Sequence, residues 1–397
     1  MTVSARSSRG RFDAVVVGGG VVGIACALGM ADAGLDVALV EATEPPAWSP
    51  AKPDLRVYAF APDNAALLDG LNVWEEAARQ RVQPYRRMRV WDAAGGDALE
   101  FDADELARPQ LGWIVEHGLL VECLWRQLER RGVVVRCPAR VTGLEQDEGG
   151  VRITLDDGGT LDARIAIAAD GGQSALRELA GIATDDRDYD QLGLVAYVRS
   201  ERPHAQTAFQ RFLPGGPLAL LPCTEGRSSI VWSLPVDEAR RLQEVDTAAF
   251  NHELTRASDA CLGALELDSA RAAFPLRRKL ARAQRAERVL LMGDAAHVVH
   301  PLAGQGVNLG LRDVSAWLHS VHDAKAKGRD FDAPARLQRW ARERRSDNAV
   351  STLAFETINR AYSNDFPVTT LLRGHALGIA GRVPMLRHAL WRHAAGI

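Results

Sequence analysis

The chain has 397 residues, of which 47% are hydrophobic, so it can bury a large core. At about 150 residues per domain, we expect two closely associated domains or one large composite domain. The formal net charge of -3 excludes nucleic acid as the main partner, because phosphate binding needs a concentrated basic excess. The 5 cysteines are scattered and include no C-x-x-C pair, which indicates a reducing, cytoplasmic compartment and no zinc site.

The first elements of the chain read as a βαβ unit. Residues 1–11 are basic and lack the apolar region of a signal peptide, so we expect a disordered lead-in and no export. A valine-rich strand (FDAVVV), a glycine-rich turn, a small-residue helix (VVGIACALGMADAG) and a second strand (LDVALVE) follow. The uncharged run 14–31 approaches the length of a membrane span, but its glycines divide it into strand and helix. This order predicts a parallel sheet covered on both faces.

The turn GGGVVG places Gly18, Gly20 and Gly23 in the G-x-G-x-x-G pattern between strand and helix. Such glycines allow a tight turn and a close approach of the backbone to a pyrophosphate, and the helix N-terminus supplies the anion site. Glu41 ends the second strand, where a carboxylate accepts hydrogen bonds from the adenosine ribose and repels a 2′-phosphate. These residues predict a dinucleotide site that disfavours NADPH, and they leave FAD and NAD equally open.

The middle of the chain, residues 55–135, is predicted to be mainly helical, with a strand near MRVWDA. Strands follow in VVVRCPARVTGLEQ and VRITLDDGGTLDARIAIAAD, and the chain returns to the first sheet at 165–169. A second block ends this strand at Asp170 and opens a helix at Ser174, with Arg177 one turn in. Taken alone, the block is equally well an ordinary strand, turn and capped helix.

From about 192 to 280, short strands broken by Gly and Pro turns surround a helix at TAAFNHELTRA. This pattern predicts a mixed sheet over a ligand, and we assign it to a substrate domain. The run RVLLMGDAA reads as a last buried strand. A helix from Gly306 follows, and then a long charged helix that we expect to be mostly solvent-facing.

A third block, GDAAHVVHPLAGQGVNLGLRDV, places Gly293 and Asp294 at the end of that last strand. The loop after them offers several free backbone N–H groups, which suit a polar ring edge or a developing negative charge. His297 and His300 have i,i+3 spacing, but no carboxylate or cysteine cluster accompanies them and Pro301 interrupts the loop. We therefore expect no metal, and histidines that shape the loop.

In this order the three blocks resemble the class A flavoprotein monooxygenases of the para-hydroxybenzoate hydroxylase fold. The third block, with LRVYAFAPDNAALLDGLNVW, QRFLPGGPLALLP and ERRSDNAVSTLAFETINRAYSND, more closely resembles the ubiquinone-biosynthesis hydroxylases, and the likeness covers nearly the whole chain. The resemblance implies an α/β fold with three parts: a Rossmann-like FAD-binding domain (12–75, 100–190 and 281–325), an interleaved mixed-sheet substrate domain (76–99 and 191–280) and a C-terminal helical region (326–397).

The same resemblance implies an FAD-dependent monooxygenase that uses NAD(P)H and O2 to hydroxylate a polyprenylated phenol ring, through a flavin C4a-hydroperoxide. The chain has one dinucleotide fingerprint, so NAD(P)H would be a transient co-substrate that reduces the flavin from a surface cleft. Two alternatives stay open. One is another flavin monooxygenase, halogenase or reductase on this fold, and the other is a non-catalytic FAD-binding module.

Site residues follow from the resemblance by position. It assigns the FAD pyrophosphate to Gly18, Gly20 and Gly23, the ribose to Glu41, and the ribityl chain to Asp294. It assigns the pyrimidine edge of the isoalloxazine to the loop and helix start formed by Gly304, Gln305, Gly306, Val307 and Asn308.

Further assignments concern the two ends of the cofactor. Val141 would pass the adenine, and Asp170 with Arg177 would organise the cofactor region and a transient nicotinamide contact. Arg56 would lie near the flavin and lower the cost of anionic intermediates, and Pro301 would border the space for oxygen transfer. One departure stands out, because the family usually has asparagine where His117 stands and a flavin-holding glutamine where Val121 stands.

The segment 366–397 has no acidic residue and is rich in arginine and histidine, with apolar residues on one face of its last predicted helix. A basic amphipathic helix of this kind has two interpretations. It packs on the core of the protein itself, or it makes peripheral contact with the inner membrane, a lipid-binding partner or other ubiquinone-biosynthesis proteins.

Overall fold

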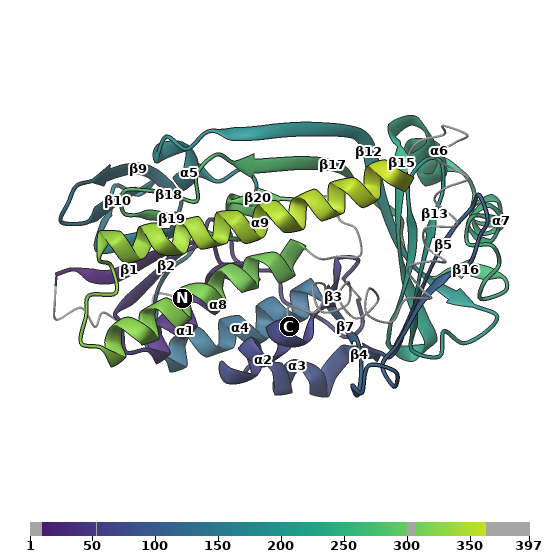
Figure 1. The fold of residues 1–397 in the computed structure, drawn as a ribbon, viewed down its shortest axis with the longest axis horizontal. Helices are drawn as coiled ribbons and strands as arrows, with labels where there is room; N and C mark the ends of the chain where they lie inside the picture. The colour runs from purple at the N-terminus through teal and green to yellow at the C-terminus, as the bar shows by residue number, and fades with distance from the viewer. Residues whose placement is uncertain (1–9, 53, 300–305, 363–397) are drawn as a thin grey trace.

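The computed structural model describes residues 10–52, 54–299 and 306–362, and nothing of the predicted elements beyond these ranges is described below. Two large sheets lie at opposite ends of an elongated molecule, and a long pair of strands connects them (Figure 1). The first sheet has a layer of helices against it, and a final long helix runs along the molecule from one end toward the other. The prediction of an α/β fold with a second, mixed sheet is confirmed.

The first sheet is built around β1 (Phe12–Val17), which pairs in parallel with β11 (Thr160–Ala168) and with β2 (Val37–Val40). Its strand order is β18-β19-β11-β1-β2-β8, so segments far apart in the chain lie side by side. The remaining strands are β8 (Val134–Arg136), β9 (Val141–Gln146), β10 (Val151–Leu155), β18 (Arg285–Ala286) and β19 (Val289–Leu291).

Both faces of this sheet are buried, which explains why β1 is apolar without alternation. Val16 packs into the cluster under the helices, and Val15 and Val17 pack into the cluster on the other face. Helices cover the first face, whereas the β9–β10 ribbon and one short helix cover the second. The helices of the first face are α1 (Val21–Asp32), α4 (His117–Arg130) and α8 (Gly306–Ala326), and the short helix is α5 (Ala175–Leu179).

The second sheet has the order β20-β17-β12-β15-β14-β13-β5-β6, with β16 beside β12. Its strands are β5 (Arg87–Asp92), β6 (Leu99–Asp102), β12 (Thr184–Ser200), β13 (Thr207–Phe212), β14 (Leu218–Pro222), β15 (Arg227–Pro235), β16 (Leu265–Leu267), β17 (Ala272–Ala281) and β20 (His297–Val298). The helices α6 (Val236–Glu244) and α7 (Thr247–Ala257) belong to this part of the chain.

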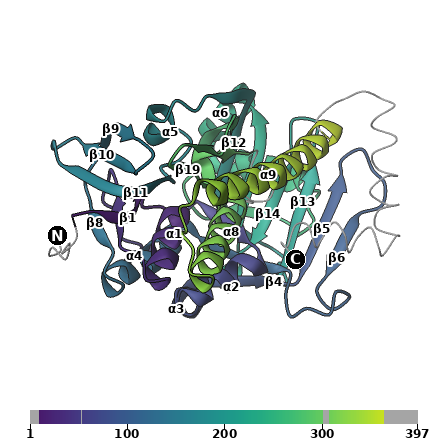
Figure 2. The ribbon, with the colours of Figure 1, turned by 60° about the vertical axis from the view of Figure 1, so that its left-hand side comes forward.

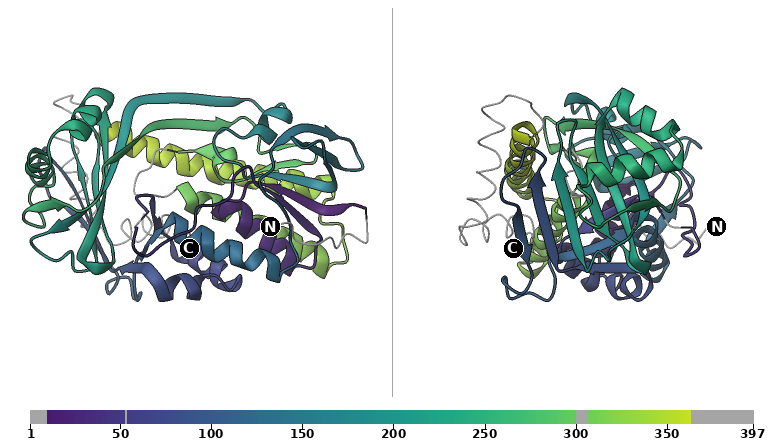
Figure 3. Two further views of the ribbon diagram at one scale, coloured as in Figure 1. Left: turned by 180° about the vertical axis from the view of Figure 1, so that it is seen from behind. Right: turned by 90° about the vertical axis from the view of Figure 1, so that its right-hand side faces the viewer.

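The strands β12 and β17 correct the expectation of short strands in this region. β12 has 17 residues and β17 has 10, and together they span the distance between the two sheets (Figure 3). Ion pairs join them outside the core, among them Arg277 to Asp188 and Lys279 to Asp186. A strand that leaves one core and enters another loses its apolar alternation in between, and this loss hid its length from the sequence pattern.

A third, three-stranded sheet overturns the prediction that residues 55–135 are mainly helical. It consists of β3 (Val57–Phe60), β7 (Gly112–Glu116) and β4 (Val82–Tyr85) in the order β3-β7-β4. Helices α2 (Pro62–Gly70) and α3 (Trp74–Arg81) lie between these strands in the chain. Strands of four or five residues are too short to set a period of their own beside helical runs, which is why the pattern missed them.

The long charged helix α9 (Pro334–Tyr362) runs beside α8 (Figure 2). Where its side chains are described it is mostly exposed, as predicted, but one face is buried. Leu337 and Trp340 pack on this face, and the Trp340 ring lies 5.9 Å from that of Trp317 in α8. Arg344 and Asn348 continue the same face and are buried too. The helix is therefore anchored by a stripe that includes polar residues.

The described ranges limit two further predictions. Residues 1–9 of the expected lead-in and the segment 366–397 lie outside them, and the domain boundaries remain a prediction. Within the described residues, no helix combines the length and apolarity that crossing a membrane requires.

Candidate functional site

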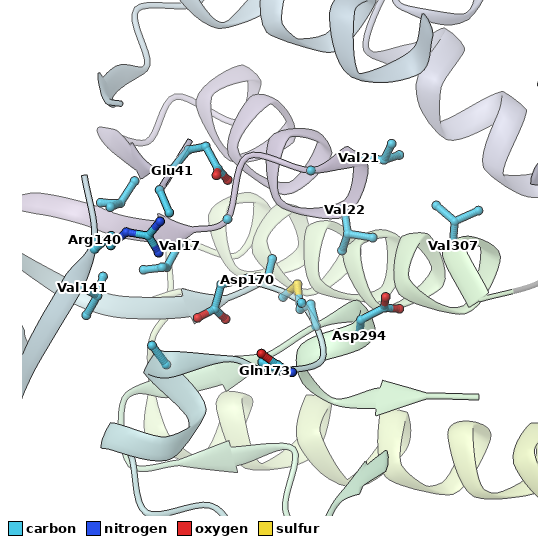
Figure 4. Close-up of a pocket in the computed structure, with 18 of the residues that line it drawn as sticks. Val17, Val21, Val22, Glu41, Arg140, Val141, Asp170, Gln173, Asp294 and Val307 are labelled. Atoms are coloured by element: carbon cyan, nitrogen blue, oxygen red, sulfur yellow. The ribbon is translucent and has the colours of Figure 1, made fainter. Parts of the chain in front are cut away.

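A cavity of about 460 Å³ opens at the carboxyl ends of β1, β2 and β11, where parallel sheets usually bind their ligands. All three sequence blocks line it: Gly18 and Gly20 from the first, Asp170 from the second and Asp294 from the third. Figure 4 shows that the cavity is elongated, with Glu41 and Val141 toward one end and Asp294 and Val307 toward the other. The structure thus brings together residues that are more than 250 positions apart in the chain.

The three fingerprint glycines have different surroundings. Gly18 has a φ of +114°, and a Cβ there would lie 2.2 Å from the carbonyl oxygen of Ala169. A Cβ on Gly23 would lie 2.0 Å from the carbonyl oxygen of Gly18. Gly20, in contrast, has no atom of the described residues within 4 Å of such a Cβ, and it lines the cavity. The first and third glycines are required by the turn itself, and the middle one leaves room for a ligand.

The structure also requires glycine at position 19, between the first two fingerprint glycines, and the pattern did not predict this. A Cβ there would lie 2.7 Å from the ring of Trp125 and 2.9 Å from Cγ of Glu41. The Trp125 indole also donates a hydrogen bond to the Gly19 carbonyl oxygen at 3.0 Å. The middle glycine of the GGG run was the available signal, because the fingerprint leaves that position unspecified.

Helix α1 starts directly after this turn and offers an anion site. Gly20 is its N-cap residue, and neither a capping side chain nor an acidic residue in the first turn occupies its N-terminal N–H groups. Free N–H groups and the helix dipole together favour a bound phosphate. The local geometry is therefore suited to a pyrophosphate.

Glu41 lies where the sequence placed it, directly after β2 and facing the cavity. Its Oε2 accepts a hydrogen bond from the Gly19 N–H at 2.5 Å, and its Oε1 accepts one from the Thr43 N–H at 2.9 Å. The carboxylate therefore stabilises the glycine turn and still borders the space that a ribose would fill.

Asp170 supplies the clearest sign of a missing partner. Its Oδ2 accepts a hydrogen bond from the Leu176 N–H at 3.2 Å, but Oδ1 is buried without a partner in the described residues. Burial raises the pKa of this carboxyl, and hydrogen bonds from the start of α5, which follows Asp170 in the chain, oppose that rise. An orphaned acceptor that lines a cavity fits a ligand with a hydroxyl or amine donor.

Arg177 is buried beside the cavity. It is 2% exposed, and its guanidinium donates to the backbone carbonyl oxygens of Ala295 and Gly172. The side chain therefore joins α5 to the turn at Gly293 and Asp294, and this contact organises the backbone around the cavity. A transient contact with a nicotinamide stays a prediction.

The turn η2 (Gly293–Ala295) is hydrogen-bonded to Asp313 of α8, which is fully buried. Asp313 accepts hydrogen bonds from the Gly293 N–H at 3.0 Å and from Arg344 Nε at 2.8 Å, and it pairs with His297 Nε2 at 2.7 Å. His297 is therefore a buried partner of a carboxylate, and His300 lies outside the described residues. In the part of the chain that the structure describes, no group of three or more His, Cys, Asp or Glu side chains could hold a metal.

The start of α8 contributes one residue to the cavity wall and one residue that binds neighbouring elements. Gly306 begins the helix and Val307 lines the cavity, whereas the Asn308 side chain faces β3 and α2. Its Oδ1 accepts hydrogen bonds from Ala61 N and from Asn64 Nδ2, and its Nδ2 donates to the carbonyl oxygen of Ala59 at 2.7 Å. The Asn308 carbonyl oxygen also accepts from Asn64 Nδ2, at 3.2 Å, so both the side chain and this carbonyl are engaged within the protein. Pro301, Gly304 and Gln305 lie outside the described residues.

Arg56, Tyr58 and His117 line the cavity from the three-stranded sheet. The Arg56 guanidinium lies over the Tyr58 ring, 5.5 Å from its centre, and the Tyr58 hydroxyl bonds to His117 Nδ1 at 2.8 Å. Tyr58 was not predicted, although it follows Arg56 by two positions, and alternate residues of a strand share a face. Val121, the other departure, is buried in the core and does not line the cavity.

These features fit FAD. The glycine turn leaves a cradle at Gly20, the N-terminus of α1 is uncapped, and Asp170 keeps an unpartnered buried oxygen. The cavity is elongated, and its volume falls in the range of about 300–1,000 Å³ usual for ligand sites.

Comparison with known proteins agrees with this geometry. A family model described as "FAD binding domain" matches residues 11–329. The 3-demethoxyubiquinol 3-hydroxylase of Escherichia coli (strain K12) is 34% identical over 96% of this chain and 98% of its own length. The ubiquinone hydroxylase UbiL of Rhodospirillum rubrum is 35% identical over 97% of this chain and 89% of its own, and the human ubiquinone biosynthesis monooxygenase COQ6 is 33% identical over 97% and 92%.

The chain belongs to the FAD-dependent ubiquinone-biosynthesis hydroxylase family.

Solved structures show that this hydroxylase has the fold of flavin monooxygenases. The p-nitrophenol 4-monooxygenase PnpA from Pseudomonas putida superposes with a TM-score of 0.76 at 20% identity, over 97% of this chain and 98% of that one. PqsL, a probable FAD-dependent monooxygenase from Pseudomonas aeruginosa, gives 0.70 at 22%, over 96% and 99%. The family model and the relatives above 30% identity show that the hydroxylase is an FAD-dependent monooxygenase with NAD(P)H as co-substrate, as the sequence predicted.

Replacing Glu41 by glutamine is expected to weaken FAD binding by about tenfold, or about 1.4 kcal/mol. The amide keeps the shape of the side chain, but it loses the negative charge and one of the two acceptor oxygens, so it cannot serve the Gly19 N–H, the Thr43 N–H and a ribose hydroxyl as the carboxylate does. A fluorescence titration of the FAD-free protein with FAD measures the change. The matched control is Glu44→Gln, because Glu44 is exposed and does not line the cavity. Equal affinity of the wild type and Glu41→Gln would contradict the assignment.

Proposed function

We propose that this hydroxylase adds oxygen to the polyprenylated phenol ring of a ubiquinone precursor, with NAD(P)H and O2 as co-substrates. One observation carries the proposal: the three motif blocks meet in a single cavity of a chain that is related over nearly its full length to hydroxylases named for ubiquinone biosynthesis. The alternative of a different monooxygenase on this fold has weaker support, because PnpA matches the full length at only 20% identity, against 34–35% for the ubiquinone hydroxylases named above.

In this proposal the residues of the cavity bind and orient the cofactor. The turn at Gly18 and the N-terminus of α1 bind the pyrophosphate, and Glu41 accepts from the adenosine ribose. Val141 passes the adenine at the same end, and Asp170 offers its unpartnered oxygen to a donor near the middle of the cavity.

The other end of the cavity would hold the reactive ring. Asp294 binds the ribityl chain, and the backbone at Gly306, Val307 and Asn308 approaches the pyrimidine edge, with Gly304 and Gln305 beyond the described residues. FAD, when bound, supplies the oxygen-transfer chemistry, so the protein needs no nucleophile of its own. Arg56 offers positive charge to anionic species there, and Pro301 would border the ring.

Expression in a bacterial strain that lacks one of its own ubiquinone hydroxylases tests the proposal. We expect ubiquinone to be restored and the phenolic intermediate of that step to disappear, as measured by mass spectrometry of lipid extracts. Growth under ¹⁸O2 should add one labelled oxygen to the ring, which separates hydroxylation from flavin reduction. Strains that lack different hydroxylases reveal the ring position. Failure to restore ubiquinone in any of them, with the protein present and yellow from FAD, would contradict the proposal.

Contacts with proteins or lipids other than the substrate remain predictions. Contact with other ubiquinone-biosynthesis proteins, with a lipid-binding partner or with the inner membrane was placed in the segment 366–397, which lies outside the described residues. A polyprenylated substrate is apolar and is held in membranes, so peripheral contact from the cytoplasmic side agrees with the proposed reaction.

A further inference from the structure

The pair formed by Tyr58 and His117 has no part in the assignments above. Tyr58 lies on β3 and His117 directly follows β7, and the backbone N–H of His117 donates to the carbonyl oxygen of Arg56 at 2.9 Å. Their rings meet edge to face, with an interplanar angle of 88° and centres 5.7 Å apart. Both side chains line the cavity beside Arg56, so the pair is part of its wall.

The pair lies at the end of the cavity proposed for the flavin ring. The side chain of Asn308 ties β3 to the start of α8, where Val307 lines the cavity. Tyr58 also lies close enough to Asp294 for the negative charge of that carboxylate to raise the pKa of the phenol, although burial is the larger cause. Figure 4 places Asp294 and Val307 together, away from Glu41 and Val141.

The hydrogen bond between the two side chains determines which imidazole nitrogen carries the proton. Tyr58 is buried, and its hydroxyl needs an acceptor for its proton. Within the described residues that acceptor is His117 Nδ1, at 2.8 Å. A ring that accepts at Nδ1 and is neutral carries its hydrogen on Nε2. Burial and the nearby Arg56 guanidinium lower the pKa of His117 to about 4, so the ring is neutral at physiological pH.

The second imidazole nitrogen, Nε2, is available to a ligand. His117 is half-buried and lines the cavity, and among the described residues no hydrogen-bond partner accepts from its Nε2. A donor held rigid by a neighbouring hydroxyl loses little entropy when it binds an acceptor. We propose that His117 donates a hydrogen bond from Nε2 to the flavin ring of FAD, and that Tyr58 is the positioning residue that fixes the imidazole for this contact.

The inference rests on the proposed function for the identity and orientation of the bound group, and it adds a contact that the glycine and aspartate motifs do not supply. A donor aimed at the ring stabilises its electron-rich reduced form more than its oxidised form. His117 should therefore raise the reduction potential of bound FAD as well as its affinity. His117 would then supply the polar contact to the flavin that a glutamine supplies in the family and that Val121 cannot make.

The test uses purified protein with FAD and without any phenolic substrate. For His117→Leu we expect the FAD dissociation constant to rise about tenfold, the equivalent of about 1.4 kcal/mol, and the two-electron reduction potential to fall. His117→Gln keeps an N–H donor and should remain nearer to the wild type. Tyr58→Phe should lower the potential less than His117→Leu, and the double variant should resemble His117→Leu alone, because the tyrosine acts through the histidine.

The matched control is Tyr85→Phe, since Tyr85 lies in the same three-stranded sheet but does not line the cavity. Its affinity and potential should equal those of the wild type. A His117→Leu protein with unchanged affinity, potential and flavin absorption spectrum would overturn the inference. If that variant does not fold, an unchanged potential in Tyr58→Phe would overturn it. Affinity and potential are measured without substrate, so they test this contact alone. A protein that fails to hydroxylate in the separate ubiquinone experiment would contradict the proposed function and not this contact.

Discussion

Replacing Gly23 by alanine is expected to prevent the fold around the cofactor from forming, at a cost of at least about 3 kcal/mol. The new Cβ would lie 2.0 Å from the Gly18 carbonyl oxygen, and this oxygen belongs to the backbone of a turn that cannot move aside. Gly18→Ala should behave alike, since it adds a Cβ 2.2 Å from another carbonyl at a φ of +114°. Urea denaturation of the FAD-free protein, followed by circular dichroism, measures the loss.

Gly20→Ala is the matched control in the same turn. Its Cβ meets no atom of the described residues within 4 Å, so the unfolding free energy should stay within about 1 kcal/mol of the wild type. The same Cβ enters the space of the proposed pyrophosphate, so FAD binding should weaken. A stable Gly23→Ala protein, or a Gly20→Ala protein that binds FAD normally, would show that the division of roles among the glycines is wrong.

Replacing Arg344 by methionine is expected to destabilise the protein by about 3–5 kcal/mol. Methionine keeps much of the volume, but Asp313 is fully buried and would lose its guanidinium partner at 2.8 Å. The loss should reach the turn at Gly293, because Asp313 also accepts from its N–H. Urea denaturation at pH 7 gives the magnitude, and Arg345→Met, at an exposed neighbour, should stay within about 0.5 kcal/mol of the wild type.

The difference in unfolding free energy between the wild type and Arg344→Met should depend on pH in a definite direction. Burial alone would raise the pKa of Asp313, but His297 and Arg344 together hold it below its ordinary value. A depressed carboxyl pKa contributes stability above the unfolded value of about 4, and this contribution is lost as the pH falls through the folded value. The gap between wild type and Arg344→Met should therefore narrow below about pH 4. A gap that is constant from pH 7 to pH 3 would show that the charge of Asp313 is not the cause.

Local pattern predicted the parts of the fold in which one element follows another directly. The glycine turn and its flanking β1 and α1 were found because valine runs and spaced glycines are short-range signals. Asp170, Asp294 and Glu41 line the cavity for the same reason, since each lies within three residues of the end of a buried strand. Helix α7 at Thr247–Ala257 was predicted to the residue, and its N-cap Asp246 accepts from the Ala249 N–H.

Interactions between distant segments were not predictable in this way. Arg344 reads as one more charge on a solvated helix, and its burial becomes evident only when α9 packs against Asp313. Tyr58 and His117 are 59 positions apart, and neither residue indicates the other until β3 and β7 pair. Arg177 was assigned by position from the family resemblance, and its hydrogen bonds to backbone carbonyls become evident only in the packed structure.

The strand order of the first sheet also affects how the protein is made. β1 and its neighbour β2 are close together in the chain, but β11, which pairs with the other edge of β1, is synthesised roughly 150 residues later and β19 later still. At about 5–20 residues per second, β1 waits on the order of 10 s for this second partner strand. During this time one edge of β1 has no partner strand in the cofactor sheet. The same order means that an incomplete chain released before β11 cannot close the cofactor sheet.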